Sequence, residues 1–236
     1  AGFEVGVNDY LTKPTHPSEL QARVKSLLAR VSEKKPVSSL SNGDGEGYVI
    51  GVLAPRGGLG VTTLAVNLAA GLHNKTKSEV IAAEMLPGQG TMALDMGVVA
   101  SKGLVDLLSI TKPADLTNAK VRDSLTPHGS GIKLLLASDR PRDMHLTGQI
   151  ANYETTLALL AGLARFVVLD LGVGMQPFAQ KVLPLCNEVL VILEGAPNTI
   201  IHTKALIDDI ASLGVNKKSI NVVLNNRIRS DAQLPS

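Results

Sequence analysis

The sequence contains little cysteine and few aromatic residues, and each shortage excludes a class of protein. Among its 236 residues the only cysteine is Cys186, so neither an internal disulfide nor a cysteine-based metal site is expected. Aromatic residues make up 3% of the chain, with no tryptophan, which argues against modules that stack nucleic-acid bases on exposed rings. There is no signal peptide and no uncharged apolar run of about 18 residues, so we expect a cytoplasmic protein without a membrane span.

Charge and apolar content favour an ordinary globular domain. The 23 basic and 21 acidic residues leave a net charge of +2, too small to attract nucleic acid or an anionic membrane. Apolar residues make up 44% of the chain, enough for a large core. Because aromatics are scarce, Val, Leu, Ile and Ala must form that core, as in parallel sheets that helices cover on both faces.

Composition divides the chain into three segments. Residues 34–47 read K-K-P-V-S-S-L-S-N-G-D-G-E-G, in which eight of fourteen residues are Pro, Ser, Asn or Gly, so they are predicted to form a flexible linker. Residues 1–33 precede this linker and residues 48–236 follow it.

The front segment, residues 1–33, resembles the end of a response-regulator receiver domain. Asn8–Pro14 reads N-D-Y-L-T-K-P, a short strand and a proline turn, and apolar residues on one helical face follow at Leu20, Val24, Leu27, Leu28 and Val31. The family pattern is a strand ending D-D-Y-L-x-K-P before an E-L-x-x-R-V helix, and its lysine, Lys13 here, senses a phosphoryl group. The family's phosphoacceptor aspartate belongs to earlier strands, so we expect no phosphorylation of residues 1–33.

The large segment, residues 48–236, alternates strands with helices, which predicts an α/β fold with a mainly parallel sheet. Expected strands are Tyr48–Ala54, Glu79–Ala83, Ile132–Ala137, Phe166–Leu171, Glu188–Leu193 and Ser219–Leu224. Expected helices are Thr62–His73, Pro113–Leu125, Met144–Ala164, Gln176–Leu183 and Pro197–Leu213.

The loop after the first strand carries the sharpest chemical signal. Ala54–Thr63 reads A-P-R-G-G-L-G-V-T-T, in which three glycines allow backbone N–H groups to point at an anion. Against the phosphate-loop pattern G-x-x-x-x-G-K-[ST], Val61 replaces the lysine and Thr62 supplies the Mg²⁺-binding hydroxyl. The pattern alone also occurs in tight helix–sheet packing, so both interpretations stay open.

The same loop resembles the K-G-G-x-G-K-T-T loop of the MinD/ParA class of P-loop ATPases. The matching residues are Gly57, Gly58, Gly60, Thr62 and Thr63. Arg56 stands where the family's signature lysine reaches across a dimer to the partner's phosphates, and Val61 replaces the ordinary lysine. The resemblance implies a three-layer P-loop NTPase fold.

Later segments narrow the resemblance to the CpaE/TadZ pilus-assembly branch of that class. Val80–Gly97 is similar to its second strand and the segment that follows, with Glu84 in place of the first aspartate and Leu86 in place of the second. Phe166–Gly172 is similar to a Walker B strand, with Asp170 as its acid. Val222–Arg227 is similar to the strand whose end contacts adenine, and Asn225, Asn226 and Arg227 are the residues implied there.

This resemblance implies weak binding of ATP or ADP, with Mg²⁺ held by Thr62 and Asp170. Loss of the loop lysine removes a charge-assisted hydrogen bond of roughly 1.5–3 kcal/mol, which weakens ATP binding about ten- to hundredfold. Val61 and Leu86 together predict a very slow or inactive ATPase. Implied partners are a second copy of the chain and pilus or secretion machinery, with peripheral association at the inner face of the membrane. The family's last strand and helix would follow residue 236.

Two alternatives stay open. A ParA-like partitioning ATPase would bind non-specific DNA through Lys217, Lys218, Arg227 and Arg229, although so few charges are more often a solvated rim. A dinucleotide-binding oxidoreductase would use Glu84, which lies 24 residues beyond Gly60, on a ribose. Thr63 stands where that fingerprint needs its third glycine, which weakens the second alternative.

Overall fold

The computed structural model describes residues 47–99 and 102–226. The predicted receiver-like tail and all but the last residue of the predicted linker lie outside these ranges, as does Arg227. The chain divides into two units, and Glu46–Ser236 contains every element described below.

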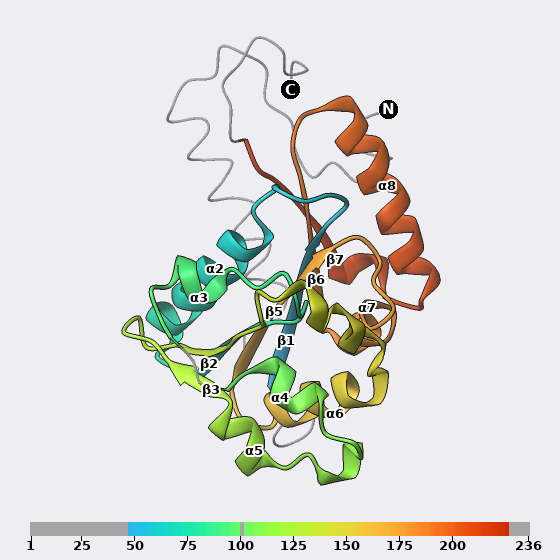
Figure 1. Ribbon diagram of the computed structural model, residues 1–236. Coiled ribbons are helices and arrows are strands. Elements are labelled where there is room, and N and C mark those ends of the chain that lie inside the picture. The colour runs from blue at the N-terminus through green and yellow to red at the C-terminus, as the bar shows by residue number, and fades with distance from the viewer. Residues whose placement is uncertain (1–46, 100–101, 227–236) are drawn as a thin grey trace. The chain divides into compact units, whose positions relative to one another are not determined.

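Seven strands form one sheet in the order β3-β4-β2-β5-β1-β6-β7. Every pair of neighbours is parallel except β3 and β4, which are antiparallel. The predicted α/β class with a mainly parallel sheet is therefore confirmed (Figure 1). The strands are β1 (Tyr48–Ala54), β2 (Val80–Glu84), β3 (Leu125–Pro127), β4 (Lys133–Leu135), β5 (Phe166–Val173), β6 (Glu188–Leu193) and β7 (Ile220–Leu224).

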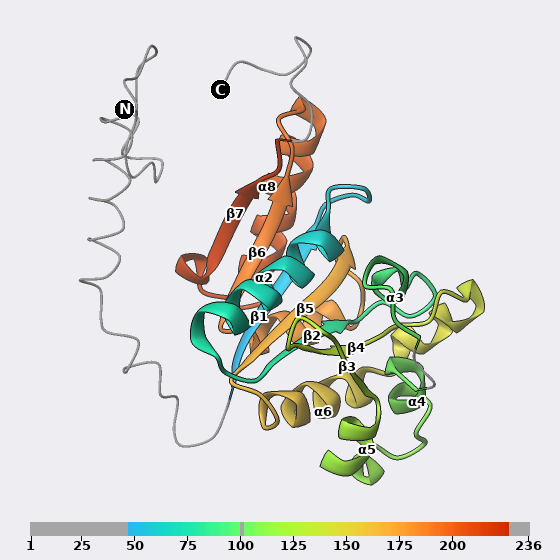
Figure 2. The same cartoon turned by 90° about the vertical axis from the view of Figure 1, so that its left-hand side faces the viewer.

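Helices cover both faces of this sheet, which gives three layers (Figures 1 and 2). The α-helices are α2 (Val61–Thr76), α3 (Met92–Asp95), α4 (Leu104–Leu108), α5 (Asn118–Asp123), α6 (Ile150–Ala161), α7 (Ala179–Val182) and α8 (Pro197–Ser212). Short 3₁₀ helices span Pro113–Asp115, Pro141–Gly148, Leu183–Leu185 and Lys217–Ser219. Buried residues of α2 and α3 belong to one core cluster, whereas those of α4 to α8 belong to the other.

The central strand β1 shows why the sequence forms this sheet. Val49 and Leu53 belong to the core cluster on one face, and Ile50, Val52 and Ala54 belong to the cluster on the other. A strand buried on both faces needs apolar residues at every position rather than at alternate ones, as the sequence Y-V-I-G-V-L-A provides.

Two predicted helices are wrong in extent. Pro113–Leu125 is interrupted because Thr117 is extended and its hydroxyl caps a new helix at Lys120 N, and Leu125 already begins β3. Met144–Ala164 is divided at Gln149, which separates the 3₁₀ helix from α6. The helices α3 and α4 are absent from the prediction, because four or five residues are too few to reveal a helical period.

The strand order determines where a ligand can bind. β1 lies between β5 and β6, and β5 lies between β1 and β2, so the loops that follow β1, β2 and β5 meet at one edge of the sheet. None of the helices within the described ranges is long and apolar enough to cross a membrane.

Candidate functional site

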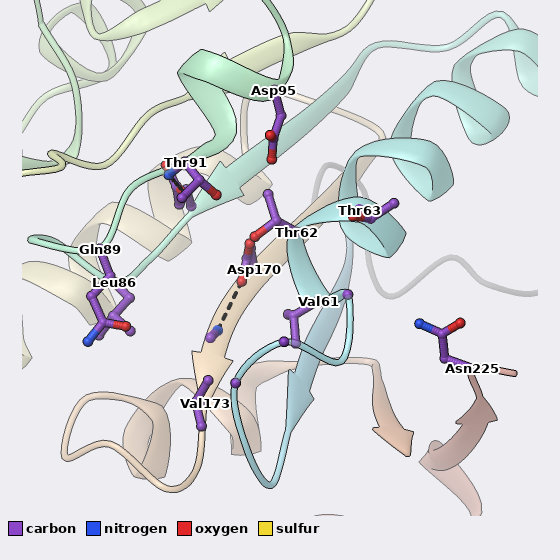
Figure 3. A pocket seen from close by; sticks show the side chains of 15 residues that line it. Val61, Thr62, Thr63, Leu86, Gln89, Thr91, Asp95, Asp170, Val173 and Asn225 are labelled. Atoms are coloured by element: carbon purple, nitrogen blue, oxygen red, sulfur yellow. Dashed lines mark hydrogen bonds between the residues drawn. The ribbon is translucent and has the colours of Figure 1, made fainter. Parts of the chain in front are cut away.

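A cavity of about 690 Å³ opens at the carboxyl ends of β1, β2 and β5 (Figure 3). Most of the residues that the sequence pointed to line it together: Gly57, Gly58, Gly60, Val61, Thr62, Thr63, Glu84, Leu86, Asp170 and Asn225. Arg56 and Asn226 are not among its lining residues.

The glycine loop owes its shape to two residues in the left-handed region. Gly58 has φ 79° and Gly60 has φ 92°, values that other residues rarely adopt. Between them the side chain of Leu59 is buried and anchors the loop to the core. From the end of β7, Asn225 Nδ2 donates a hydrogen bond of 2.7 Å to the Leu59 carbonyl. A Cβ atom on Gly60 would lie 3.1 Å from that Nδ2 atom, so glycine is needed here for space as well as for backbone conformation.

The loop leads directly into the N-terminus of α2, a helix of 16 residues. Gly60 is its N-cap and, among the described residues, no side chain caps it. The first helical hydrogen bond runs from Leu64 N to the Gly60 carbonyl at 2.9 Å, so the N–H groups of residues 61–63 have no intrahelical partner. These groups and the positive end of the helix dipole favour an anion at this position.

Thr62 and Asp170 form the core of the site. The Thr62 hydroxyl interacts with the Asp170 carboxylate, which accepts a hydrogen bond of 3.0 Å from Gly172 N (dashed line in Figure 3). Burial raises the pKa of Asp170, and the bonds from Thr62 and Gly172 act in the opposite direction. A hydroxyl beside a carboxylate is a donor set that suits a hard cation such as Mg²⁺, so these residues fit the ion that the sequence resemblance implies.

The Glu84 carboxylate holds two backbone segments in place through hydrogen bonds. Its Oε1 atom accepts hydrogen bonds from Thr91 N at 2.7 Å and Met92 N at 3.1 Å, and its Oε2 atom accepts one from Ala137 N at 3.0 Å. Burial is the main cause that raises its pKa to about 7, and the neighbouring Asp170 adds to the rise, while the three backbone bonds lower it. Both oxygens therefore fasten the segments after β2 and β4, and this arrangement disfavours the ribose-binding role of the dinucleotide alternative.

Arg56 is engaged within its own chain. Its guanidinium forms an ion pair with Glu194, just after β6, and its Nε atom donates a 3.1 Å hydrogen bond to Thr199 Oγ1 on α8. The side chain is 46% exposed and that of Glu194 is 23% exposed. Both partner residues were missed by sequence reasoning, since they lie far along the chain from the loop.

The cavity has apolar groups where P-loop ATPases carry charged ones. Val61 begins α2 and is 8% exposed, packed in the same core cluster as Val66 and Ala69. Leu86 is 5% exposed and its Cδ2 atom lies close to Gly172. No lysine, arginine or histidine is among the described residues that line the cavity.

Several lining residues are not among the site residues expected from the sequence. Gln89, Thr91 and Asp95 enter from the segment after β2, and Gly172 and Val173 enter from the end of β5. Only Asp95 had a visible cue, as a single acid in an otherwise apolar A-L-D-M-G stretch. Asn226 is exposed and lies outside the cavity, and the exposed Lys217 and Lys218 belong to a 3₁₀ helix before β7.

Several solved structures share the fold of the large unit. The chain is similar to a ParA family ATPase from Chlorobium tepidum, with a TM-score of 0.67 and 16% identity over 75% of this chain and 73% of that one. It is similar to the septum site-determining protein MinD of Pyrococcus horikoshii, solved with Mg-ADP, with a TM-score of 0.63 and 18% identity over 80% and 74% of the two chains. Cobyrinic acid a,c-diamide synthase of Mycobacterium smegmatis, solved with an ATP analogue and magnesium, gives a TM-score of 0.58 and 18% identity over 75% and 72%.

Sequence comparison adds relatives for the N-terminal part alone. The regulatory protein PhoP of alkaline phosphatase synthesis in Bacillus subtilis is 43% identical over 49 residues, and the probable transcriptional regulator ycf27 of Cyanophora paradoxa is 44% identical over 52 residues. These matches cover 21% and 22% of this chain, and the chain spans about a fifth of the length of these relatives. No protein-family model matches the chain. The comparisons show response-regulator likeness at the N-terminus and a P-loop NTPase fold of the MinD/ParA kind in the large unit.

Proposed function

We propose that the cavity binds ADP or ATP together with Mg²⁺, weakly and without efficient hydrolysis. The observation that carries this proposal is the Thr62–Asp170 pair, which lies beneath a left-handed glycine loop at the uncapped N-terminus of α2. The loop and the helix end would hold the phosphates, and the pair would hold the ion, which supplies positive charge next to the phosphate oxygens. Solved proteins of the same fold contain Mg-ADP or an ATP analogue with magnesium.

Two apolar residues explain why binding should be weak and turnover slow. A loop lysine normally adds a charged hydrogen bond to the phosphates, and Val61, the first residue of α2, is instead buried in the core. Phosphoryl transfer needs an oriented attacking water and stabilisation of charge in the transition state. Leu86 offers no group that orients water at its place in the cavity wall.

The finer proposal is a dimeric organiser of the CpaE/TadZ type rather than an efficient ATPase. A response-regulator-like N-terminal part ahead of a MinD/ParA-type fold is the arrangement of that pilus-assembly branch, and the P-loop and the Glu84 segment support the assignment. Its partners would be a second copy of the chain and pilus or secretion proteins, in the cytoplasm or at the inner face of the membrane.

A nucleotide-binding experiment tests the proposal that the cavity binds ADP or ATP. Calorimetric titration with ADP, ATP and NAD, each with Mg²⁺, should give weak binding of the adenine nucleotides and none of NAD. Thr62→Ala should abolish it, while Thr155→Ala, at a half-buried position of α6 outside the cavity, should not. Preferential NAD binding would favour the dinucleotide enzyme and remove the proposal.

Measurements of self-association and of DNA binding test the proposal that the chain is a dimeric organiser. With nucleotide contacts weak, dimerisation must rely on direct protein contacts, so sedimentation should show a dimer without added nucleotide. Arg56→Ala should weaken this dimer, whereas Lys217→Ala should not. A monomer that dimerises only with ATP would restore the ordinary nucleotide switch, and tight binding of non-specific duplex DNA would favour the partitioning alternative.

A further inference from the structure

The charge of the cavity is unusual for a phosphate site. Three carboxyl groups line it, those of Glu84, Asp95 and Asp170, and within the described part of the chain no basic side chain lines it. Arg56, the basic residue within the glycine loop, is held by Glu194, just after β6, and by Thr199 on α8. Within the described part of the chain, a phosphate chain that entered alone would meet neutral hydrogen-bond donors, such as backbone N–H groups and the Gln89 amide, but no cationic side chain, opposite three carboxyl groups.

Asp95 differs from the other two carboxyl groups because no described residue bonds to its carboxylate. Glu84 is bonded to three backbone N–H groups, and Asp170 is bonded to Thr62 and Gly172. Among the described residues, the carboxylate of Asp95 has no hydrogen bond or ion pair, and it is directed from α3 toward Thr62 (Figure 3).

The backbone of Asp95 is held by its surroundings, while its side chain is exposed. The short helix α3 is anchored by the bonds from Thr91 N and Met92 N to Glu84, and the side chain of Met92 is fully buried. The Asp95 N–H donates to the Thr91 carbonyl at 3.0 Å, which ties the residue to that anchored turn. The Asp95 carboxylate thus points from a tethered turn toward Thr62, in the cavity that Asp170 also lines (Figure 3).

We infer that this cavity accepts the phosphates of a nucleotide only as a complex with a divalent cation, and that Asp95 helps to hold that cation. This inference rests on the proposed function and extends it. In a site with a loop lysine, the protein itself neutralises part of the phosphate charge. Here the neutralising charge must arrive with the ligand, because the described residues of the cavity contribute carboxyl groups and no cation.

Fluorescence titration with N-methylanthraniloyl-ADP tests the inference in four arms, with wild type and Asp95→Asn each measured in Mg²⁺ and in EDTA. Wild type should lose at least about a hundredfold in affinity when Mg²⁺ is removed, since the ion is the only cation at the phosphates. Asp95→Asn should bind about tenfold more weakly than wild type in Mg²⁺, because one charged partner of the ion is gone. In EDTA the same variant should bind more tightly than wild type, because one repulsive carboxylate is gone.

The variant is thus expected to bind more weakly than wild type in Mg²⁺ and more tightly in EDTA. A merely structural role for Asp95 would not produce opposite changes of affinity in the two conditions. Asp208→Asn, an exposed acid on α8, is the matched control and should behave as wild type in both conditions. Equal affinity of wild type with and without Mg²⁺, or an unchanged Asp95→Asn, would overturn this inference and leave the proposed function standing. Absence of binding by wild type in both conditions would remove the proposed function, and this inference with it.

Discussion

Glu84 and Asp170 occupy the same register position on the neighbouring parallel strands β2 and β5, which places two buried carboxyl groups side by side at the carboxyl edge of the sheet. The charge of Asp170 contributes to the raised pKa of Glu84, although burial is the larger cause. The protein thus keeps an acid of nearly neutral pKa in the wall of the cavity.

This pair predicts a pH-dependent stability. The pKa of Glu84 rises from an ordinary 4.5 to about 7 on folding, so between these values the folded chain binds the proton that the unfolded chain has released. The free energy of unfolding should therefore fall as pH rises from 4.5 to about 7, and the contribution is fully present only below that window. Urea denaturation at several pH values measures this slope.

The variant Glu84→Gln isolates the contribution. Its amide can accept from only one side, so it should be less stable than wild type by about 1–3 kcal/mol, with a shallower slope through the window. Glu154→Gln, an exposed acid on α6, should keep the wild-type slope. An unchanged slope in Glu84→Gln would mean that this carboxyl does not titrate as described.

Local sequence determined the glycine loop and every described strand except β3, which was not expected. The bounds of β1 and β6 are those expected, because continuous apolar runs that end at turn residues allow few other structures. The loop was visible because its residues are consecutive and its glycines are required by φ 79° at Gly58 and 92° at Gly60. Helix breaks at Thr117 and Gln149 were missed, because they depend on a hydroxyl cap and one backbone angle rather than on apolar periodicity.

The parts of the site that depend on distant segments were not predictable. Arg56 was expected to point away from its own chain, yet Glu194 is 138 residues further on and only the fold brings the two together. Asp95 was missed for the same reason, since its direction depends on α3 and on the anchoring of that helix by Glu84. Sequence patterns reveal residues that act as consecutive neighbours, and they leave out those that meet through topology.

The conformation of the loop predicts different effects at two of its glycines. Gly60→Ala places a Cβ atom 3.1 Å from Asn225 Nδ2 at a residue with φ 92°, so it should cost about 1–2 kcal/mol of stability and reduce nucleotide affinity. Gly57→Ala enters open space and should leave stability near that of wild type. Thermal melting of the two variants compares them directly, and equal melting temperatures would contradict the assigned strain.

Restoring the missing lysine should raise nucleotide affinity. Val61→Lys supplies a charge-assisted bond to the phosphates, which is expected to tighten ADP binding about ten- to hundredfold. The nucleotide-free variant should melt at a lower temperature, because Val61 is packed in the core. Val61→Met, with a long uncharged side chain, is the control and should gain no affinity. Calorimetric titration decides the matter, and no gain with lysine would mean that the loop does not face phosphate.

Hydrolysis should be absent from the unmodified chain. With Val61 and Leu86 in place of charged groups, phosphate release from ATP should equal that of the Thr62→Ala variant and of buffer. A coupled phosphate assay over several hours is sensitive enough to detect slow turnover. Sustained turnover that Thr62→Ala abolishes would contradict the degenerate-site interpretation.

The ion pair between Arg56 and Glu194 predicts a link between the loop and assembly. Because the pair is partly exposed, a double-mutant cycle of Arg56→Gln and Glu194→Gln should give a coupling of at most about 1 kcal/mol in the free energy of unfolding. If Arg56 also reaches a second copy of the chain, Glu194→Gln releases the guanidinium and should strengthen the dimer, whereas Arg56→Gln should weaken it. Sedimentation at several protein concentrations measures both shifts, and Glu188→Gln, at the opposite end of β6, tests whether loss of any acid has the same effect. Weakening of the dimer by Glu194→Gln would instead show that the pair must stay closed for assembly, with Arg56 acting only on its own chain.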